Sequence, residues 1–302
     1  MDNRKPTTDI FESGERNKVL PGVLYLVATP IGNMSDITYR AVKVLSEVDI
    51  VAAEDTRNSG KLLTLLGISR PMISYHEHNK ATRGPEIVAR LCGGESCALI
   101  TDAGTPGISD PGEDIVRLCA EAGVTVTSLP GACAGITALT ISALPTSRFA
   151  FEGFLPASGR ERRERIAELC RERRTLILHE APHRLRTTLT DLAAAFAGGR
   201  RISLCRELTK LNEEVLRLTL DAAVEYYNTK EPRGEYVLVI EGAADAAECE
   251  AFWCDMTPAE HAAHYIATGM SERDAIKTAA DERRVSKNVV YNDYMKLKNA
   301  RK

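Results

Sequence analysis

The sequence lacks several features that would assign it to a class directly. No apolar run approaches the ~20 residues of a membrane-spanning helix, so we expect no association with a membrane. Residues 1–20 are polar and contain no apolar signal-peptide core, so we expect a mobile leader and a cytoplasmic protein. The net charge is only −3, so no overall positive field attracts nucleic acid, although a basic site can still occur locally.

Metal and nucleotide motifs are also missing. The eight cysteines are scattered, and the pairs Cys92/Cys97 and Cys249/Cys254 have no partner pair at zinc-site spacing, so we expect reduced thiols and no metal site. The stretch YHEHNK lacks H-E-x-x-H spacing. Neither a G-x-x-x-x-G-K-[ST] loop nor a G-x-G-x-x-G fingerprint occurs, which excludes the P-loop and the common dinucleotide-binding motif.

Short strand-like runs alternate with helical patterns in the first half of the chain. The runs that predict strands are 23–28, 49–55, 97–104 and 124–131. The patterns that predict helices are 38–48, 59–67, 82–94 and 113–123. Such alternation is typical of βαβ units, so we expect a mainly parallel sheet.

The pattern changes after a boundary near residues 131–148. A charged helix is predicted at 161–174, and strands then follow one another more closely, at 175–181, 201–208, 213–220 and 234–242. Shorter helical stretches fall at 184–197 and 221–228, so the second sheet should be mixed. The rest reads as helices, at 257–267, 271–281 and 286–298. We therefore predict an N-terminal α/β domain (21–135), a C-terminal α/β domain (136–245) and a helical basic tail domain (246–302).

Glycine-bearing loops follow four predicted strands, at 27–38, 53–60, 101–112 and 128–135. Ligands of open α/β sheets bind at the carboxyl ends of the strands, and glycine lets a ligand approach the backbone closely. The 101–112 loop uses far more chain than a strand-to-helix connection needs. It is therefore a predicted ligand site, with an elaborate structural turn as the alternative.

Eight sequence blocks between residues 23 and 242 carry a resemblance to a known family. They are LYLVATPIGNMSDITYRAVKVLSEVDIVAAEDTRNSGKLL, SYHEHN, ITDAGTPGISDPG, LPGACAGITAL, FEGFLP, EAPHRL, CRELTKLNEE and GEYVLVIEG. In this order they resemble the tetrapyrrole-methylase superfamily of S-adenosylmethionine enzymes, and within it the branch that methylates ribosomal RNA. The resemblance implies two α/β domains with a cofactor cleft between them, plus a small helical C-terminal domain.

The resemblance also implies which residues hold S-adenosyl-L-methionine. They are Pro30, Asp102, Ala103, Gly104, Gly107, Ile108, Cys133, Ala134 and Glu180. Tetrapyrrole-directed members usually have Gly-Asp-Pro where this chain has Ala-Gly-Thr-Pro, so the acid has moved to Asp102. Cys133 stands where the superfamily usually has threonine, and Leu218 stands where we expect glycine.

The function that the resemblance implies is 2′-O-methylation of a cytidine in the decoding region of small-subunit ribosomal RNA. The substrate would be that RNA or the assembled small subunit, and the protein would be a homodimer. Two alternatives stay open: a methylase of a tetrapyrrole or another small molecule that uses the same cleft, and a non-catalytic RNA-binding protein on the same scaffold.

Acidic and basic side chains near the predicted loops are candidates for catalysis and RNA binding. A ribose 2′-hydroxyl is a poor acid, so a base should assist its attack, and the candidates are Glu54, Asp55, Glu180 and His183. The candidate RNA contacts are Arg57, His76, Arg184, Arg206, Lys210, Arg284 and Lys287. Residues 283–302 carry seven lysines and arginines against one acid, with Tyr291 and Tyr294 among them. This segment is either an RNA-contacting helix or a solvated face.

Overall fold

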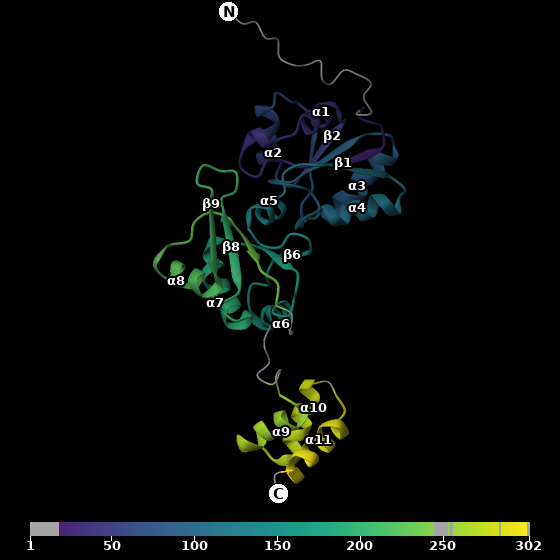
Figure 1. The fold of residues 1–302 in the computed structure, drawn as a ribbon. Helices are drawn as coiled ribbons and strands as arrows, with labels where there is room; N and C mark the ends of the chain where they lie inside the picture. Colours follow the sequence, from purple (N-terminus) through teal and green to yellow (C-terminus); the bar gives the residue numbers. More distant parts are fainter. Residues whose placement is uncertain (1–17, 245–252, 254–255, 284, 301–302) are drawn as a thin grey trace, which may run out of the picture. The chain divides into compact units, whose positions relative to one another are not determined.

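The computed structural model describes residues 18–244, 253, 256–283 and 285–300, and it divides into two compact units, 1–243 and 244–302 (Figure 1). Most of the predicted leader, residues 1–17, lies outside the described residues. The first unit contains two sheets and the second contains helices. No helix among the described residues is long and apolar enough to cross a bilayer.

The first sheet has five parallel strands in the order β3-β2-β4-β1-β5, which confirms the predicted parallel sheet. The strands are β1 (Val23–Val27), β2 (Ile50–Ala53), β3 (Met72–Ser74), β4 (Cys97–Ile100) and β5 (Thr125–Leu129). The sequence analysis missed β3. It is a three-residue edge strand, exposed or half-buried, and too short to show an alternating pattern.

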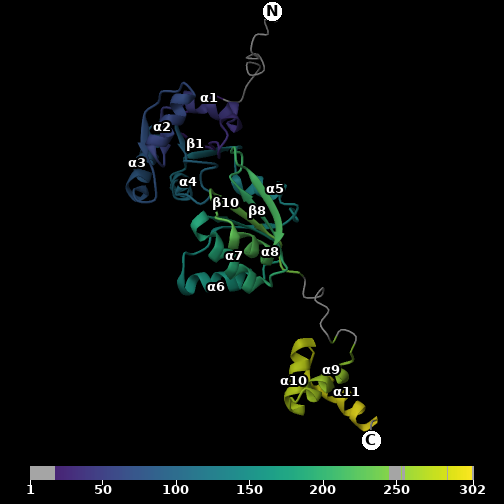
Figure 2. The ribbon, with the colours of Figure 1, turned by 90° about the vertical axis from the view of Figure 1, so that its left-hand side faces the viewer.

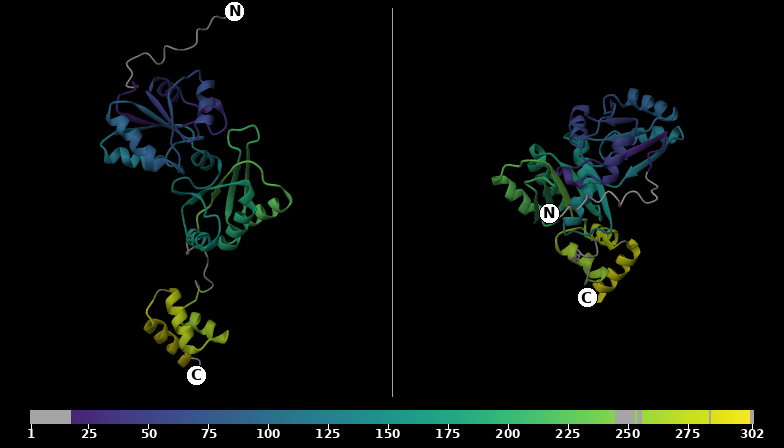
Figure 3. Two further views of the ribbon diagram at one scale, coloured as in Figure 1. Left: turned by 180° about the vertical axis from the view of Figure 1, so that it is seen from behind. Right: turned by 90° about the horizontal axis from the view of Figure 1, so that it is seen from above.

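Helices cover both faces of this sheet (Figure 3). One face carries α1 (Tyr39–Glu47) and α2 (Thr56–Leu65), and the other carries α3 (Lys80–Cys92) and α4 (Gly112–Glu121). A short 3₁₀ helix, η2 (Met34–Asp36), precedes α1. Helix α2 begins three residues before its predicted start because the Asp55 carboxylate accepts the backbone N–H of Arg57 and caps it.

The second sheet is mixed, as predicted, in the order β6-β7-β10-β8-β9. Only the β6–β7 pair is parallel. Its strands are β6 (Phe149–Phe154), β7 (Thr175–Glu180), β8 (Arg201–Arg206), β9 (Glu214–Thr219) and β10 (Tyr236–Ile240). One face packs on α6 (Gly159–Leu169), α7 (Pro182–Phe196) and α8 (Leu220–Thr229), and the other packs on α5 (Ala134–Ile141).

The sequence analysis did not predict α5 or β6. The α5 sequence, AGITALTI, is almost wholly apolar and short, so it shows no helical periodicity. Strand β6 is interrupted by an irregularity in register between Phe151 and Gly153, which breaks the alternation of its side chains. Both segments lie in the stretch that joins the two sheets.

The second unit is a bundle of α9 (Pro258–Ala267), α10 (Glu272–Arg283) and α11 (Lys287–Ala300) (Figure 2). Ala262, Ile276, Ala279 and Val290 belong to its core. Thr257 and Glu260 form a capping box at the start of α9, which the sequence predicts as a helix over 257–267.

Candidate functional site

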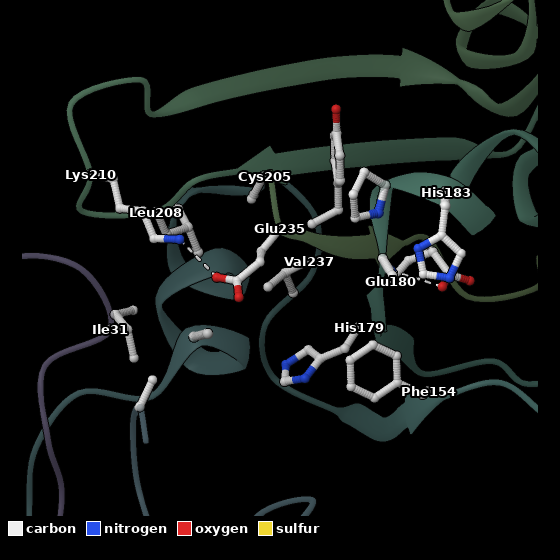
Figure 4. Close-up of a pocket in the computed structure, with 15 residues that line it drawn as sticks. Ile31, Phe154, His179, Glu180, His183, Cys205, Leu208, Lys210, Glu235 and Val237 are labelled. Carbon is white, nitrogen blue, oxygen red and sulfur yellow. Dashed lines mark hydrogen bonds and ion pairs between the residues drawn. The ribbon is translucent and has the colours of Figure 1, made fainter. Parts of the chain in front are cut away.

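A cavity of about 480 Å³ lies where loops of the first sheet meet the carboxyl end of β7 (Figure 4). This volume is in the range of small-molecule sites, which is about 300–1,000 Å³. The first half of the unit contributes Ile31, Ala103 and Ala134. The second half contributes Phe154, His179, Glu180, Ala181, Pro182, His183, Cys205, Leu208, Lys210, Glu235, Tyr236 and Val237.

Hydrogen bonds join the loops that follow β1, β4 and β5 into one wall. Thr29 and Gly104 exchange two backbone hydrogen bonds, of 3.0 and 3.1 Å. The Thr105 hydroxyl donates to the Ala132 carbonyl at 2.9 Å. Gly104 is buried and has a φ of +86°, which an L side chain rarely adopts. This wall therefore depends on glycine for its backbone shape.

The long loop between β4 and α4 wraps around a carboxylate. Asp110 accepts the backbone N–H groups of Gly107, Ile108 and Gly112, at 2.7–3.1 Å. This arrangement leaves Ala103 and Ile108 exposed at the edge of the sheet. The extra chain is thus a hydrogen-bonded turn, and Ala103 from this loop lines the cavity.

Strand alternation decides which side chains of the second sheet face the cavity. His179 pairs across β10 with Val237, which pairs with Cys205, and this row lies on the α5 face. The next row, which contains Glu180 and Tyr236, lies on the opposite face, which α6–α8 cover. A single position along β7 therefore moves a side chain from one face of the sheet to the other.

Glu180 is consequently engaged beneath α7. Its side chain is 1% exposed. The carboxylate accepts the Ala181 N–H at 2.9 Å and the Thr188 hydroxyl, and it lies 3.4 Å from Arg184 Nε. Arg162 in turn donates to the Thr188 hydroxyl at 2.9 Å. Glu180 borders the cavity at the turn into α7, but both of its carboxylate oxygens fix that turn, which opposes the predicted role as a base.

His179, which the sequence analysis did not single out, faces the cavity instead. Its ring contacts Phe151 and Phe154 edge-on, with centroid distances of 5.2 and 5.5 Å. Its Nε2 atom is buried without a hydrogen-bond partner among the described residues, and burial lowers the pKa, so the ring stays neutral. An unpaired ring nitrogen at a cavity indicates a polar ligand group. The alternation of side-chain directions along the predicted strand 175–181 was the signal that could have shown that His179 and Glu180 lie on opposite faces of the sheet.

The acids that follow β2 have unlike environments. The guanidinium and backbone N–H of Arg57 hydrogen-bond to Asp55 and hold its pKa at about 2, so this carboxylate is a weak base. Burial raises the pKa of Glu54, and the nearby charges of Asp102 and Asp110 raise it further. Asp102 also accepts a 3.1 Å hydrogen bond from Asn58. Glu54 is therefore the better proton acceptor of the two.

The candidate RNA contacts do not form one cluster. Arg57 follows β2 and His76 follows β3, at the carboxyl end of the first sheet. The backbone N–H of His76 donates to the Asn79 side chain. Arg206 pairs with Glu214 at 3.0 Å on the face away from the cavity.

Two of the other candidates are already paired. Arg184 donates to the carbonyls of Leu155 and Pro156. Lys210 pairs with Glu207 and Glu235 at the cavity wall. Lys287 is exposed at the start of α11 in the second unit, and Arg284 lies outside the described residues.

Two other predictions concern cofactor-loop residues. Pro30 and Asp102 border a smaller neighbouring cavity of about 260 Å³. Cys133 is the N-cap residue of α5, directly before Ala134. Leu218 packs in the core on the α6–α8 side of the second sheet.

Among the described residues, no group of three or more metal-ligating side chains could hold a metal ion.

Comparison with known proteins gives consistent matches. The sequence model of the family Tetrapyrrole (Corrin/Porphyrin) Methylases matches residues 23–224. Ribosomal RNA small subunit methyltransferase I of Halalkalibacterium halodurans is 46% identical over 274 residues, 90% of this chain and 94% of that protein. The protein of the same name from Synechocystis sp. is 45% identical over 276 residues, 91% of this chain and 98% of that protein.

Solved structures are similar in fold. Uroporphyrin-III-C-methyltransferase from Thermus thermophilus superimposes with a TM-score of 0.53 at 20% identity, over 72% of this chain and 94% of that one. A structure of that enzyme complexed with S-adenosyl homocysteine gives a TM-score of 0.52 at 18% identity, over 72% of this chain and 96% of that one. The two-sheet architecture is therefore shared.

Proposed function

The chain belongs to the tetrapyrrole-methylase family, and from this membership we propose that it is an S-adenosylmethionine-dependent methyltransferase of small-subunit ribosomal RNA. The observation that carries the proposal is near-full-length identity of about 45% to proteins named for that activity, together with a cavity between the two α/β halves. The finer proposal is that the methyl group goes to the ribose 2′-oxygen of a cytidine in the decoding region. A ribosomal substrate implies a cytoplasmic location.

The cavity has the properties that S-adenosylmethionine requires. Ile31, Ala103 and Ala134 give an apolar wall, and the unpaired His179 Nε2 offers a hydrogen bond to a polar group. Of the residues proposed to hold the cofactor from the first half, Ala103 and Ala134 line this cavity. The others lie on the flanking loops, and they are Pro30, Asp102, Gly104, Gly107, Ile108 and Cys133. Glu180 would contribute indirectly, by fixing the turn from β7 into α7. When bound, the cofactor supplies a methyl group on a positively charged sulfur that is a good leaving group.

The protein then has to align the ribose and remove a proton. Positioning alone can lower a barrier by about 7–11 kcal/mol, so rigid loops around the cavity account for much of the catalysis. We propose Glu54 as the base. It does not line the cavity itself, but it follows β2 and lies near Asp102, next to the cavity-lining Ala103, and its raised pKa favours proton acceptance over that of Asp55. His183, exposed at the cavity rim, is the alternative base. Asp55, with a pKa of about 2, serves as a helix cap.

The helical unit supplies RNA affinity in this proposal. Helix α11 follows α10 in the chain and exposes Lys287 and Tyr291. The basic excess of residues 283–302 favours phosphate contacts in this unit, although Lys296 pairs with Asp293 and Lys298 with Glu272. Arg57, with a side chain 86% exposed, could add a phosphate contact at the edge of the first sheet.

A homodimer is also proposed, through an apolar surface on the first unit. Phe149, Phe151 and Phe154 are exposed on β6, which is an edge strand, and Ile108 and Ile136 are exposed on elements that contact it. Exposed apolar side chains gathered along an edge strand are typical of a protein interface. Sedimentation should give a dimer for the parent protein and a monomer for Phe149→Glu; a monomeric parent would contradict the proposal.

The proposed activity is tested by methyl transfer. The purified protein is incubated with isotopically labelled S-adenosylmethionine and small ribosomal subunits from cells that lack the protein, and the RNA is then digested and mapped by mass spectrometry. We expect one methyl group on the ribose of one cytidine. Label on a base would overturn the 2′-O proposal, and cofactor binding with methylation of a tetrapyrrole alone would favour the small-molecule alternative. No cofactor binding would favour a non-catalytic RNA-binding protein.

A further inference from the structure

The connection between β8 and β9, residues 207–213, is longer and more ordered than a hairpin requires. Hairpin loops usually need about 2–5 residues, and this one has seven. Figure 1 shows it extending from the second sheet toward the first half of the unit. We call residues 207–213 the β8–β9 strap.

The strap contacts both the cavity and the loop that follows β1. Leu208 is buried and lines the cavity together with Lys210 (Figure 4). A Cβ atom on Gly32, in the loop after β1, would lie 2.4 Å from Lys210 Cγ, so the strap rests directly on that loop. Glu207 and Thr209 have left-handed φ angles of 52° and 65°, a conformation that is unfavourable for these residues and concentrates at functional sites.

The Lys210 charge is compensated by two carboxylates, and the Glu213 carboxylate is held by a backbone N–H. The Lys210 ammonium donates to Glu207 at 2.9 Å and to Glu235 at 2.8 Å. The Thr209 N–H donates to the Glu213 carboxylate at 2.6 Å. These contacts hold the strap in one shape. They also engage the Lys210 ammonium with two carboxylates, so in this inference the strap contacts RNA through a different residue.

What the strap presents to solvent is an apolar side chain. Leu211, at its tip, is completely exposed, with 101% of its reference area accessible, and the neutral Asn212 follows it. The strap borders the cavity and exposes a leucine next to an asparagine. An apolar leucine side chain is suited to pack on the face of an unstacked nucleobase, and the amide is suited to hydrogen-bond with its edge. Proteins that read RNA sequence mostly bind bases that have been removed from a stack.

We propose that Leu211 is a wedge that contacts an RNA base beside the methylated nucleotide and keeps it unstacked, so that the target ribose can reach the cavity. This inference rests on the proposed function. Unstacking a nucleotide costs a few kcal/mol, and an apolar side chain that occupies the vacated place offsets part of that cost. The wedge acts on substrate alignment and makes no contact with the cofactor.

The test compares four variants by kcat/KM on small ribosomal subunits that lack the modification. Leu211→Ala removes the wedge, Leu211→Asn keeps its approximate size without its apolar character, and Leu211→Phe keeps an apolar surface that can also stack. Leu20→Ala, at another exposed leucine (56%), is the matched control. Because Leu211 makes no packing contacts, melting temperature and S-adenosylhomocysteine affinity should stay at parent values in all Leu211 variants.

We expect Leu211→Ala and Leu211→Asn to lower kcat/KM by about 10-fold or more, within the range that one base contact provides. Leu211→Phe should stay within about threefold of the parent, and Leu20→Ala should match it. Parent-level kcat/KM in Leu211→Ala or Leu211→Asn would overturn the wedge, and so would a loss in Leu211→Phe as large as in Leu211→Ala. A parent protein that binds cofactor but methylates no ribosomal RNA would overturn the proposed function itself, and the wedge with it.

Discussion

Gly32→Ala tests whether the β8–β9 strap closes the cofactor cavity. Gly32 has an ordinary φ, so alanine is allowed by the backbone and its effect arises from space alone. The new methyl group would lie 2.4 Å from Lys210 Cγ, 2.8 Å from Thr209 Oγ1 and 3.2 Å from the Leu208 carbonyl oxygen. Carbon atoms do not approach that closely, so the strap has to move away from the loop after β1.

The expected magnitude follows from the cost of overpacking. Inserting a methyl group into a well-packed site typically costs about 1–3 kcal/mol. If the strap closes the cavity only when it rests on Gly32, this cost is subtracted from cofactor binding. An affinity loss of about 5-fold to 140-fold then follows, since 1.4 kcal/mol corresponds to a factor of ten.

Calorimetric titration with S-adenosylhomocysteine measures this loss. Gly199→Ala is the matched control, because a methyl group there meets nothing within 4 Å and its φ is ordinary. The double variant Gly32→Ala/Lys210→Ala removes the atom that clashes most and should recover part of the affinity. Parent affinity in Gly32→Ala would refute the reasoning, and so would an equal loss in Gly199→Ala.

Three further changes have expected outcomes. Glu54→Gln should lower single-turnover methylation by about 10²-fold or more. Burial and nearby acids raise the pKa of Glu54 in the folded protein above its ordinary value of 4.5, so ionisation of this carboxyl at a pH above 4.5 destabilises the fold. Melting curves should therefore show the variant more stable than the parent at neutral pH but equal to it at lower pH. Deleting residues 244–302 should preserve cofactor affinity and flatten the salt dependence of RNA binding, because phosphate contacts release counterions. Arg162→Ala should lower the free energy of unfolding by about 1–3 kcal/mol in denaturant titration, since the buried guanidinium joins Thr188 to Asp191.

Each of these has a contradicting result. A Glu54→Gln variant that methylates at the parent rate would leave His183 as the base to test. An unchanged salt slope after the deletion would mean that the helical unit does not contact phosphate. Parent stability in Arg162→Ala would mean that the network beneath α7 contributes nothing measurable.

The sequence predicted the sheet types well because their signals are local. Parallel strands separated by helices, and closely spaced strands in the second half, follow directly from the order of apolar runs. The missed elements are those whose identity depends on distant parts of the chain. Helix α5 is short and mostly apolar because it packs on the second sheet and meets Ile31 of the first half. The sequence of 134–141 therefore has no amphipathic periodicity that would predict a helix.

The sequence indicated which loops border the cavity but not the directions of the side chains around it. The glycine loop at 101–112 borders the cavity as expected, through Ala103. The direction of Glu180 depends on the parity of β7, and its carboxylate belongs to a network with Thr188 on α7 and Arg162 on α6. Asp55 seemed a candidate base, yet it is the cap of α2, since capping is decided by where the helix begins.

The central claim is that S-adenosylmethionine binds in the cavity between the two α/β halves. A crystal structure of the full chain with S-adenosylhomocysteine tests it directly. We predict ligand density that contacts Ala103 and Ala134 on one side and the His179 ring on the other, with a hydrogen bond to His179 Nε2. Density confined to the neighbouring cavity at Asn58 and Lys61, or to the helical unit, would contradict the claim.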